Sequence, residues 1–203
     1  DYSYLQYRIL AKMFSCPMTI LGDKMQTMGE KQVDVLSFLP GIFGKDLYRM
    51  ELTKSYRSTV EILELAAAVS GEKTINCISR KGKMPVWYAS YDKEQMYTHL
   101  VQALNTMEDV ETAAVLCLDQ EMAENVSEEL KERMPRMEIS LLTKDTKTFK
   151  PGLCVTTFYL AKGLEFDAVM IPFLEKYRTA FHRQALYINI TRALHVCNLF
   201  SAG

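Results

Sequence analysis

Closely spaced cysteines are missing from this sequence. Its five cysteines form no CxxC motif, and its three histidines show no metal-ligand spacing with them. The absence of these spacings argues against a zinc ribbon or a zinc finger, and we expect no structural metal. Three cysteines lie inside apolar, strand-like segments (Cys117, Cys154 and Cys197). This placement is typical of buried, reduced thiols in a cytosolic protein.

Long apolar runs and an excess of one charge are also missing. No stretch approaches the ~20 apolar residues that a membrane helix needs, and the first residues lack the basic start and apolar core of a signal peptide. We therefore expect a cytoplasmic protein with no membrane partner. The formal net charge is −1, so any contact with nucleic acid has to come from a local groove.

Strands that alternate with helices fill most of the sequence. Helical patterns cover residues 58–70, 92–107, 119–134 and 181–193, and strand-like segments cover residues 18–21, 85–90, 113–118, 138–142, 153–158, 168–173 and 196–200. This alternation predicts an α/β fold with a largely parallel sheet and helices on both faces. Ligands bind such sheets at the carboxyl ends of strands, so the informative loops are those after residues 21, 52, 118 and 158.

The helix predicted at residues 58–70 carries signals at both ends. Ser58 opens it and Glu61 follows three positions later, a spacing that predicts a capping box. Gly71 is placed to close the helix. Asp92 and Asp119 open the next two helices in the same way, as N-caps.

Four short segments stand out because of their order along the chain. They are LGDKMQ at 21–26, TKSYRS at 53–58, TTFYLAKGLEFD at 156–167 and LYINITRA at 186–193. In this order they resemble the GDxxQ, NYRS, TxHxAKGLEFD and YVAxTRA motifs of UvrD/Rep-like superfamily 1 helicases. Tyr159 stands where the common pattern has histidine, which resembles the helicase IV branch most.

The resemblance implies a RecA-like fold, a three-layer sandwich, and a division into two parts. Residues 1–50 would be the tail of the first RecA-like lobe, and residues 51–203 the second lobe. The phosphate-binding GxxxxGK[ST] loop and the Mg²⁺-binding Asp-Glu pair of the family would lie before Asp1. We therefore expect the full-length protein to hydrolyse ATP with Mg²⁺ held by the first lobe, and these 203 residues alone to be inactive.

The resemblance also implies catalytic residues. Arg57 and Arg192 would act as arginine fingers on the γ-phosphate, because a guanidinium is always charged and binds two oxygens at once. Gln26 would sense the γ-phosphate, in a loop that Asp23 helps to order. No residue of this chain is expected to bind the metal ion.

Further residues would contact the nucleotide and the nucleic acid. Tyr56 would stack on the adenine ring, and Glu165 would accept hydrogen bonds from the ribose. Gly163 would allow a tight backbone turn beside the ligand. The nucleic-acid contacts implied by the resemblance are Thr157, Tyr159 and, between nucleotide and strand, Lys162. Asp167 is as readily explained by a purely structural role.

Three functions remain open at this point. The first is the C-terminal lobe of a DNA helicase or translocase, with DNA and its own N-terminal RecA-like lobe as partners. The alternative is a helicase-like remodelling factor that binds RNA polymerase and hydrolyses ATP without unwinding. A third, an interaction domain without catalysis, is disfavoured by the joint presence of Gln26, Arg57, Glu165 and Arg192.

Overall fold

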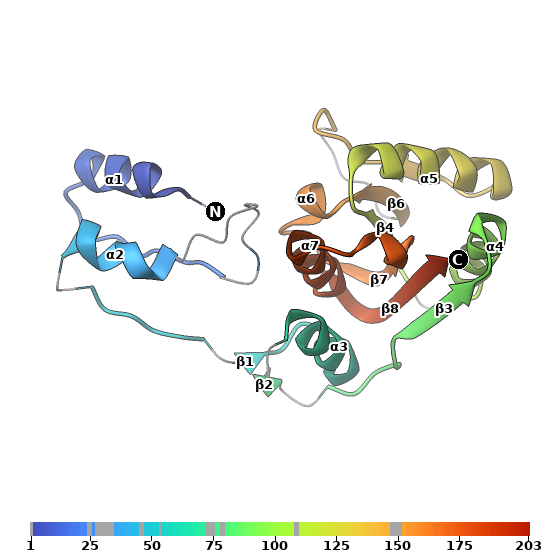
Figure 1. Cartoon of the computed structure of the whole chain (residues 1–203), viewed down its shortest axis with the longest axis horizontal. Coiled ribbons are helices and arrows are strands. Elements are labelled where there is room, and N and C mark those ends of the chain that lie inside the picture. Colours follow the sequence, from blue (N-terminus) through green and yellow to red (C-terminus); the bar gives the residue numbers. More distant parts are fainter. Residues whose placement is uncertain are drawn as a thin grey trace. The chain divides into compact units, whose positions relative to one another are not determined.

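The chain divides into two units, Asp1–Thr53 and Lys54–Gly203. A computed structural model (Figure 1) describes residues 2–23, 26, 35–44, 47–52, 54–71, 76–77, 80–107, 110–146 and 152–203. Four residues of the motif analysis lie outside this set: Asp1, Lys24, Met25 and Thr53. The assignment of the two parts to a first and a second lobe stays a prediction.

The first unit contains a pair of helices, α1 (Tyr4–Met13) and α2 (Val35–Phe43). They pack through aromatic side chains: the ring of Tyr7 lies 5.8 Å from that of Phe38, centroid to centroid. Tyr7 and Leu39 are buried, and most other described side chains of this unit are exposed. Its apolar core is therefore small.

The strand predicted at residues 18–21 is wrong. In the structure these residues are in neither helix nor strand. A strand satisfies its backbone groups by pairing with a neighbour, and no described residue pairs with 18–21. The segment is apolar, as the sequence shows, but a strand forms only beside a partner strand, and the local sequence does not reveal whether one is present.

The second unit is built on a six-stranded sheet in which every ladder is parallel. The strand order is β3-β8-β7-β4-β6-β5. The strands are β3 (Val86–Ser90), β4 (Thr112–Cys117), β5 (Ile139–Leu141), β6 (Gly152–Thr157), β7 (Phe166–Ile171) and β8 (Ala193–Ala202). A separate parallel pair joins β1 (Lys54–Ser55) to β2 (Asn76–Cys77).

Helices lie on both faces of this sheet (Figure 1). They are α3 (Val60–Ser70), α4 (Lys93–Asn105), α5 (Gln120–Arg133), α6 (Phe158–Ala161), the 3₁₀ turn η2 (Leu174–Lys176) and α7 (Ala180–Ile190). α4 and α5 pack on one face around a continuous apolar core, and α3 and α7 pack together against the other. The predicted α/β class, with a parallel sheet covered by helices on both faces, is confirmed. Within the described residues, no helix combines the length and apolarity that crossing a membrane requires.

The N-terminal end of α3 differs from the prediction. The N-cap is Thr59, not Ser58, and its side chain forms no capping hydrogen bond. Ser58 instead donates its hydroxyl to the carbonyl of Ala193 (2.6 Å), so the capping box with Glu61 is wrong. The Ser58 hydroxyl thus has a long-range partner, the carbonyl of Ala193, in place of the local backbone amide that a capping box would use. Gly71 closes the helix at φ 74°, as predicted.

The other predicted caps are confirmed. The carboxylate of Asp92 accepts from the amide of Gln95, and that of Asp119 accepts from the amide of Met122, both at 2.8 Å. These bonds satisfy backbone donors that the first helical turn leaves open. They fix the starts of the two helices, α4 and α5, that cover the same face of the sheet.

The buried cysteines are also confirmed. Cys117, Cys154 and Cys197 are free thiols inside the sheet. Burial raises the pKa of Cys154 and of Cys197 to about 12 and raises the pKa of Cys117 further. These thiols are therefore protonated at neutral pH and are poor nucleophiles. Cys16, in the first unit, is exposed.

The core under α4 gives a direct test of the packing. Met96 is fully buried there, whereas Met84 is exposed. Met96→Ala is expected to lower the free energy of unfolding by about 2–5 kcal/mol, because it leaves a cavity. The matched change Met84→Ala should cost less than about 0.5 kcal/mol. Urea denaturation of both variants measures this, and equal losses would contradict the assigned packing.

Candidate functional site

Two of the motif loops lie side by side at the amino edge of the sheet. Glu165 directly precedes β7 and Arg192 directly precedes β8, and these strands are neighbours. The amide of Phe166 donates to the carbonyl of Arg192 (2.9 Å). The loop after residue 158, which the sequence singled out, does follow a strand, but Glu165 lies at its far end, beside the amino end of β7. α6 and the loop after it carry the chain from the carboxyl end of β6 to the amino end of β7.

Arg57 joins these loops from the start of α3. The Ser58–Ala193 hydrogen bond ties its turn to the first residue of β8. Its Nε lies 2.7 Å from Oε1 of Glu165, and the two side chains are 55% and 36% exposed. An ion pair this open to water contributes about 0–1 kcal/mol, so either partner can exchange it for a ligand. We call Arg57, Glu165 and Arg192 the amino-edge cluster.

Arg192 differs from Arg57 in its exposure. It is only 2% exposed, and its guanidinium donates to the carbonyls of Ile188 and Leu164 and to the hydroxyl of Thr191, each at 3.3 Å. Burying this charge is costly unless hydrogen bonds satisfy it. The bond to Leu164 holds the loop that carries Glu165. A contact with phosphate would require this buried guanidinium to become accessible to the ligand.

Gly163 and Tyr56 lie next to the cluster along the chain. Gly163 has φ +90°, a conformation that side chains rarely adopt, and a Cβ there would meet open space. The backbone angle, rather than crowding, is what requires glycine. The Tyr56 ring is 70% exposed, so it is accessible to a flat ligand.

The predicted nucleic-acid residues gather at the other end of the same segment. Thr157 is buried and caps α6 by accepting from the amide of Leu160. Lys162 ends that helix. Tyr159 is 47% exposed, and its ring lies 6.5 Å from that of Phe181, at the start of α7. Tyr159 is thus outside the core. The Thr157 hydroxyl, by contrast, is already used to cap α6, and this bond competes with its expected contact to nucleic acid.

Gln26 belongs to the first unit. Its side-chain amide donates to Asp23 (2.7 Å), and its backbone amide donates to the carbonyl of the same residue (3.2 Å). This contact agrees with the predicted ordering of the loop by Asp23. The link from Gln26 to a γ-phosphate stays a prediction.

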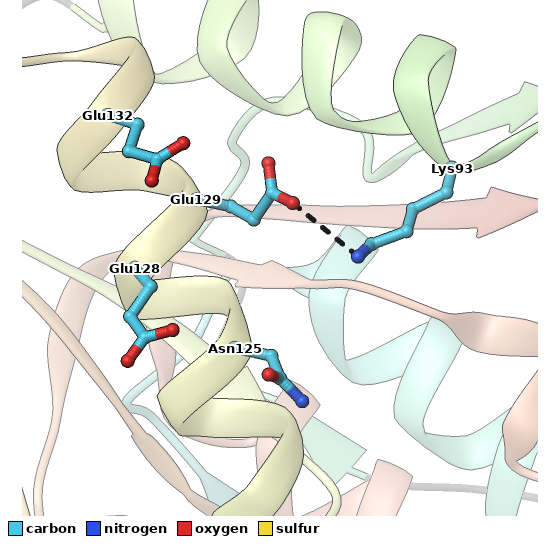
Figure 2. A pocket seen from close by; sticks show the side chains of 5 residues that line it. All are labelled: Lys93, Asn125, Glu128, Glu129 and Glu132. Atoms are coloured by element: carbon cyan, nitrogen blue, oxygen red, sulfur yellow. Dashed lines mark ion pairs between the residues drawn. The ribbon is translucent and has the colours of Figure 1, made fainter.

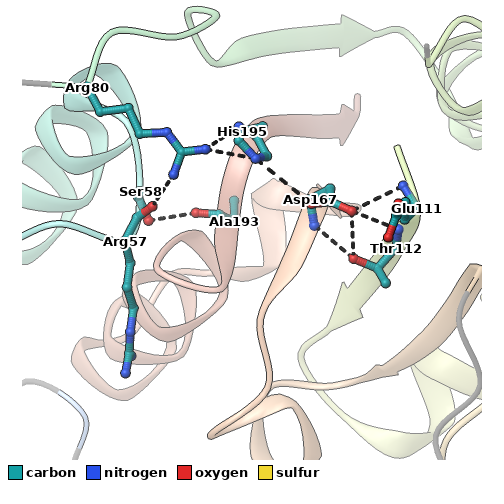
Figure 3. Close-up of polar contacts among 8 residues, drawn as sticks. All are labelled: Arg57, Ser58, Arg80, Glu111, Thr112, Asp167, Ala193 and His195. Carbon is teal, nitrogen blue, oxygen red and sulfur yellow. Dashed lines mark hydrogen bonds and ion pairs between the residues drawn. The ribbon is translucent and has the colours of Figure 1, made fainter. Parts of the chain in front are cut away.

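Asp167 has a structural role at the amino edge. Its Oδ2 accepts from the amides of Glu111 and Thr112 (3.1 and 2.9 Å) and from the Thr112 hydroxyl (3.0 Å), as Figure 3 shows. Partial burial alone would raise the pKa of this carboxyl, but these hydrogen bonds outweigh it and hold the pKa below the usual value. Asp167 therefore fixes the start of β4 against β7.

Two residues that the sequence did not mark lie beside the predicted ones. Arg80 donates to the carbonyl of Arg57 (3.2 Å) and contacts His195. The second such residue is Phe181, whose ring lies beside that of Tyr159. Arg80 and Phe181 both belong to segments outside the four motifs. The usable signal for Arg80 was the basic run RKGK at 80–83, and for Phe181 the mixture of basic and aromatic residues in KYRTAFHR.

A depression between α4 and α5 is unsuited to phosphate. Figure 2 shows its lining by one cation and polar or acidic residues: Lys93, Asn125, Glu128, Glu129 and Glu132. Lys93 pairs with Glu129 at 3.5 Å, so the surface is acidic. The amino-edge cluster, with two arginines and one carboxylate, is the better candidate site despite its openness.

Comparisons with known proteins agree with the motif residues. Residues 152–200 match the UvrD-like helicase C-terminal domain, a range that contains Thr157, Tyr159, Glu165 and Arg192. The C-terminal domain of a possible DNA helicase from Lactobacillus plantarum WCFS1 has 29% identity and a TM-score of 0.61, over 73% of this chain and 88% of that one. The matched region is thus similar in sequence and fold to the C-terminal lobe of a UvrD-like helicase.

More distant structures show weaker likeness. The C-terminal domain of the DEAD-box protein Dbp5 has 15% identity and a TM-score of 0.45, over 59% of this chain and 76% of that one. An arterivirus nonstructural protein 10 (helicase) in complex with DNA has 12% identity and a TM-score of 0.45, over 70% of this chain and 30% of that one. No curated protein matches the chain. The finer likeness to the helicase IV branch stays a prediction.

Asp167 provides a pH test of the amino edge. Asp167→Asn is expected to lower the free energy of unfolding at pH 7 by about 1–2 kcal/mol, because bonds to a charged acceptor become bonds to a neutral one. Since the folded-state pKa is depressed, the stabilisation is complete above the unfolded-state pKa of about 4 and is lost as the pH falls through the folded-state pKa. The difference between variant and wild type should therefore narrow at acid pH.

Denaturation curves measured between pH 7 and pH 3 check this expectation. Asp145→Asn, in an exposed turn after β5, serves as the control and should change stability little at any pH. A difference for Asp167→Asn that does not depend on pH would contradict the assigned role of the charge.

Proposed function

We propose that this chain contains the C-terminal ATPase and translocase lobe of an ATP-dependent DNA helicase, which works in the cytoplasm. The observation that carries the proposal is the amino-edge cluster. Three motifs far apart in sequence supply Arg57, Glu165 and Arg192. The Arg57–Glu165 ion pair, the hydrogen bond from the Ser58 hydroxyl to Ala193 and the hydrogen bond from the Arg192 guanidinium to Leu164 link their loops. The UvrD-like match of residues 152–200 supports the same reading.

Arg57 is suited to phosphoryl transfer. Hydrolysis of ATP concentrates negative charge on the γ-phosphate oxygens, and preplaced cations stabilise that charge. The planar guanidinium of Arg57 can bind two oxygens at once. Its present partner, Glu165, holds it at the site through a contact that water weakens. Arrival of the nucleotide would exchange that carboxylate for phosphate.

Arg192 and Gln26 complete the proposed catalytic set. Arg192 stabilises the loop before β7 through Leu164 and would add a second positive charge near the phosphates when the site closes. Gln26 would sense the γ-phosphate from the first unit. In this scheme Arg57 acts directly, and Arg192 both shapes the site and acts on the phosphate.

The remaining residues of the site would hold the nucleoside. The exposed ring of Tyr56 would stack on adenine, and Glu165, once released from Arg57, would accept from the ribose hydroxyls. The turn at Gly163 gives the ligand close access to the backbone. The sequence contains no GxxxxGK[ST] loop, so the phosphate loop and Mg²⁺ would come from another lobe, with ATP bound between the two.

Nucleic acid would contact the opposite end of the lobe. Tyr159, Thr157 and Lys162 lie on or beside α6, and the loop that follows α6 ends at Glu165. α7 makes a second connection, because it starts beside Tyr159 at Phe181 and ends just before Arg192. Both connections could pass a movement at the nucleotide to the strand. Alternate closing and opening of two lobes would then give directional stepping on DNA.

The proposal is tested first at Arg57. In the full-length protein, Arg57→Ala is expected to lower the turnover of DNA-stimulated ATP hydrolysis about 10³-fold, as for other arginine fingers. The KM for ATP should change less, because the guanidinium acts mainly on the transition state. Arg57→Lys should not restore turnover, since an ammonium cannot reproduce the planar fork.

Steady-state ATPase kinetics with single-stranded DNA present measure these effects. Arg136→Ala removes an exposed arginine elsewhere on the lobe and should leave the kinetics unchanged. Wild-type turnover in Arg57→Ala would overturn the proposal.

Tyr159 tests the nucleic-acid side. Tyr159→Ala is expected to weaken single-strand binding by roughly 1–3 kcal/mol, the usual contribution of a base stacked on an aromatic ring. ATP affinity should stay unchanged, because the ring lies outside the amino-edge cluster. Fluorescence anisotropy with labelled oligonucleotides gives the DNA affinity, with Tyr91→Ala, another exposed tyrosine, as the control. If Tyr159→Ala and Tyr91→Ala bind the oligonucleotide equally tightly, the DNA strand does not contact Tyr159.

A further inference from the structure

Residues 80–82 hold the start of α3 from outside the four motifs. The carbonyl of Arg80 accepts from the amide of Val60, the first residue of the helix (3.0 Å). The amide of Gly82 donates to the carboxylate of Glu61 (2.9 Å). The first bond satisfies a free donor of the first helical turn, and the two bonds together seat the segment against the turn that carries Arg57.

Gly82 shows how close this contact is. A Cβ at this position would lie 2.3 Å from Cγ2 and 2.9 Å from Cβ of Thr59, distances that real side chains do not reach. Any residue other than glycine would force the segment or the Thr59 side chain to move. The carbonyl of Arg80 and the amide of Gly82 both hold the segment beside the start of α3.

The guanidinium of Arg80 bridges two elements. Its Nη1 donates to the carbonyl of Arg57 (3.2 Å), and its Nη2 lies 2.8 Å from both ring nitrogens of His195, on β8. Which ring nitrogen accepts from Arg80 depends on the tautomer of His195. Figure 3 shows the Arg57 side chain pointing away from Arg80. Arg80 thus holds the backbone of Arg57 and leaves its guanidinium able to reach a ligand.

His195 is itself placed by the strand and by a neighbouring carboxylate. Its Nε2 lies 3.9 Å from Oδ1 of Asp167, whose other oxygen is occupied by the start of β4. A chain of contacts therefore runs from β4 through Asp167, His195 and Arg80 to the backbone of Arg57 (Figure 3).

We propose that Arg80 is a positioning residue for Arg57, an inference that rests on the proposed function. Arg80 fixes the backbone carbonyl of Arg57, and so sets where the Arg57 guanidinium can meet the γ-phosphate in the transition state. It does not itself touch the nucleotide. Loss of Arg80 would leave ATP binding intact and misplace the catalytic cation, which lowers kcat rather than raising KM.

The test compares Arg80→Ala in two backgrounds of the full-length protein, wild type and Arg57→Ala. In the wild-type background we expect kcat for ATP hydrolysis to fall about 10- to 100-fold, the effect of a misplacement near 1 Å, with KM for ATP unchanged. In the Arg57→Ala background no further loss is expected, because Arg80 acts through Arg57. Lys83→Ala, which removes an exposed cation from the same segment, should change neither value.

Two more variants keep the test informative if Arg80→Ala does not fold, as judged from its thermal unfolding. Arg80→Lys retains the charge, but an ammonium cannot form the fork that spans Arg57 and His195, so kcat should fall. His195→Phe removes the acceptor that orients Arg80 and should lower kcat by a smaller factor. Normal kcat in both variants overturns the proposal.

The outcomes separate this inference from the proposed function. If Arg57→Ala abolishes turnover but the Arg80 variants are normal, only the positioning role fails. If Arg80→Ala lowers kcat by the same factor in both backgrounds, Arg80 acts independently of Arg57 and the inference also fails. If Arg57→Ala has normal turnover, the proposed function itself fails.

Discussion

The candidate site depends on one buried hydrogen bond, from the hydroxyl of Ser58 to the carbonyl of Ala193 (2.6 Å). The two residues are 135 positions apart, and the bond joins the turn before α3 to the first residue of β8. A buried hydroxyl without a partner is costly, so burial of this pair fixes the contact. Arg57 is thereby placed beside Arg192, and the parallel pairing of β7 with β8 brings the loop of Glu165 to the same place.

The elements were predictable where the signal was local. Apolar runs identified the central strands, and Asp92 and Asp119, as N-caps, identified α4 and α5. Both signals depend only on residues that are neighbours in the sequence. Ser58 was misassigned because its hydroxyl found an acceptor far along the chain. Residues 18–21 were misassigned because an apolar run becomes a strand only beside a partner strand.

The site was predictable only in part. Short motifs singled out Arg57, Glu165 and Arg192 as candidates. They did not reveal that Glu165 lies at the amino end of β7, since the crossing of the chain through α6 is not visible in sequence. Arg80 was not identified, because nothing in the run RKGK tells which cation turns back toward α3. The constraint on Gly82 emerges only from its packing on Thr59, a contact made in three dimensions.

The pairing of Arg57 with Glu165 has a consequence for selectivity among anions. In the proposed function the lobe would be surrounded by phosphates, since each nucleotide of a bound strand carries one. A bare arginine near such a strand would attract those phosphates without discrimination. With Glu165 at 2.7 Å, the charge of Arg57 is matched by an opposite charge on the same surface. In the proposed function, an intruding phosphate diester, with a single negative charge, would gain little by displacing the carboxylate, whereas the more highly charged triphosphate of ATP would gain more.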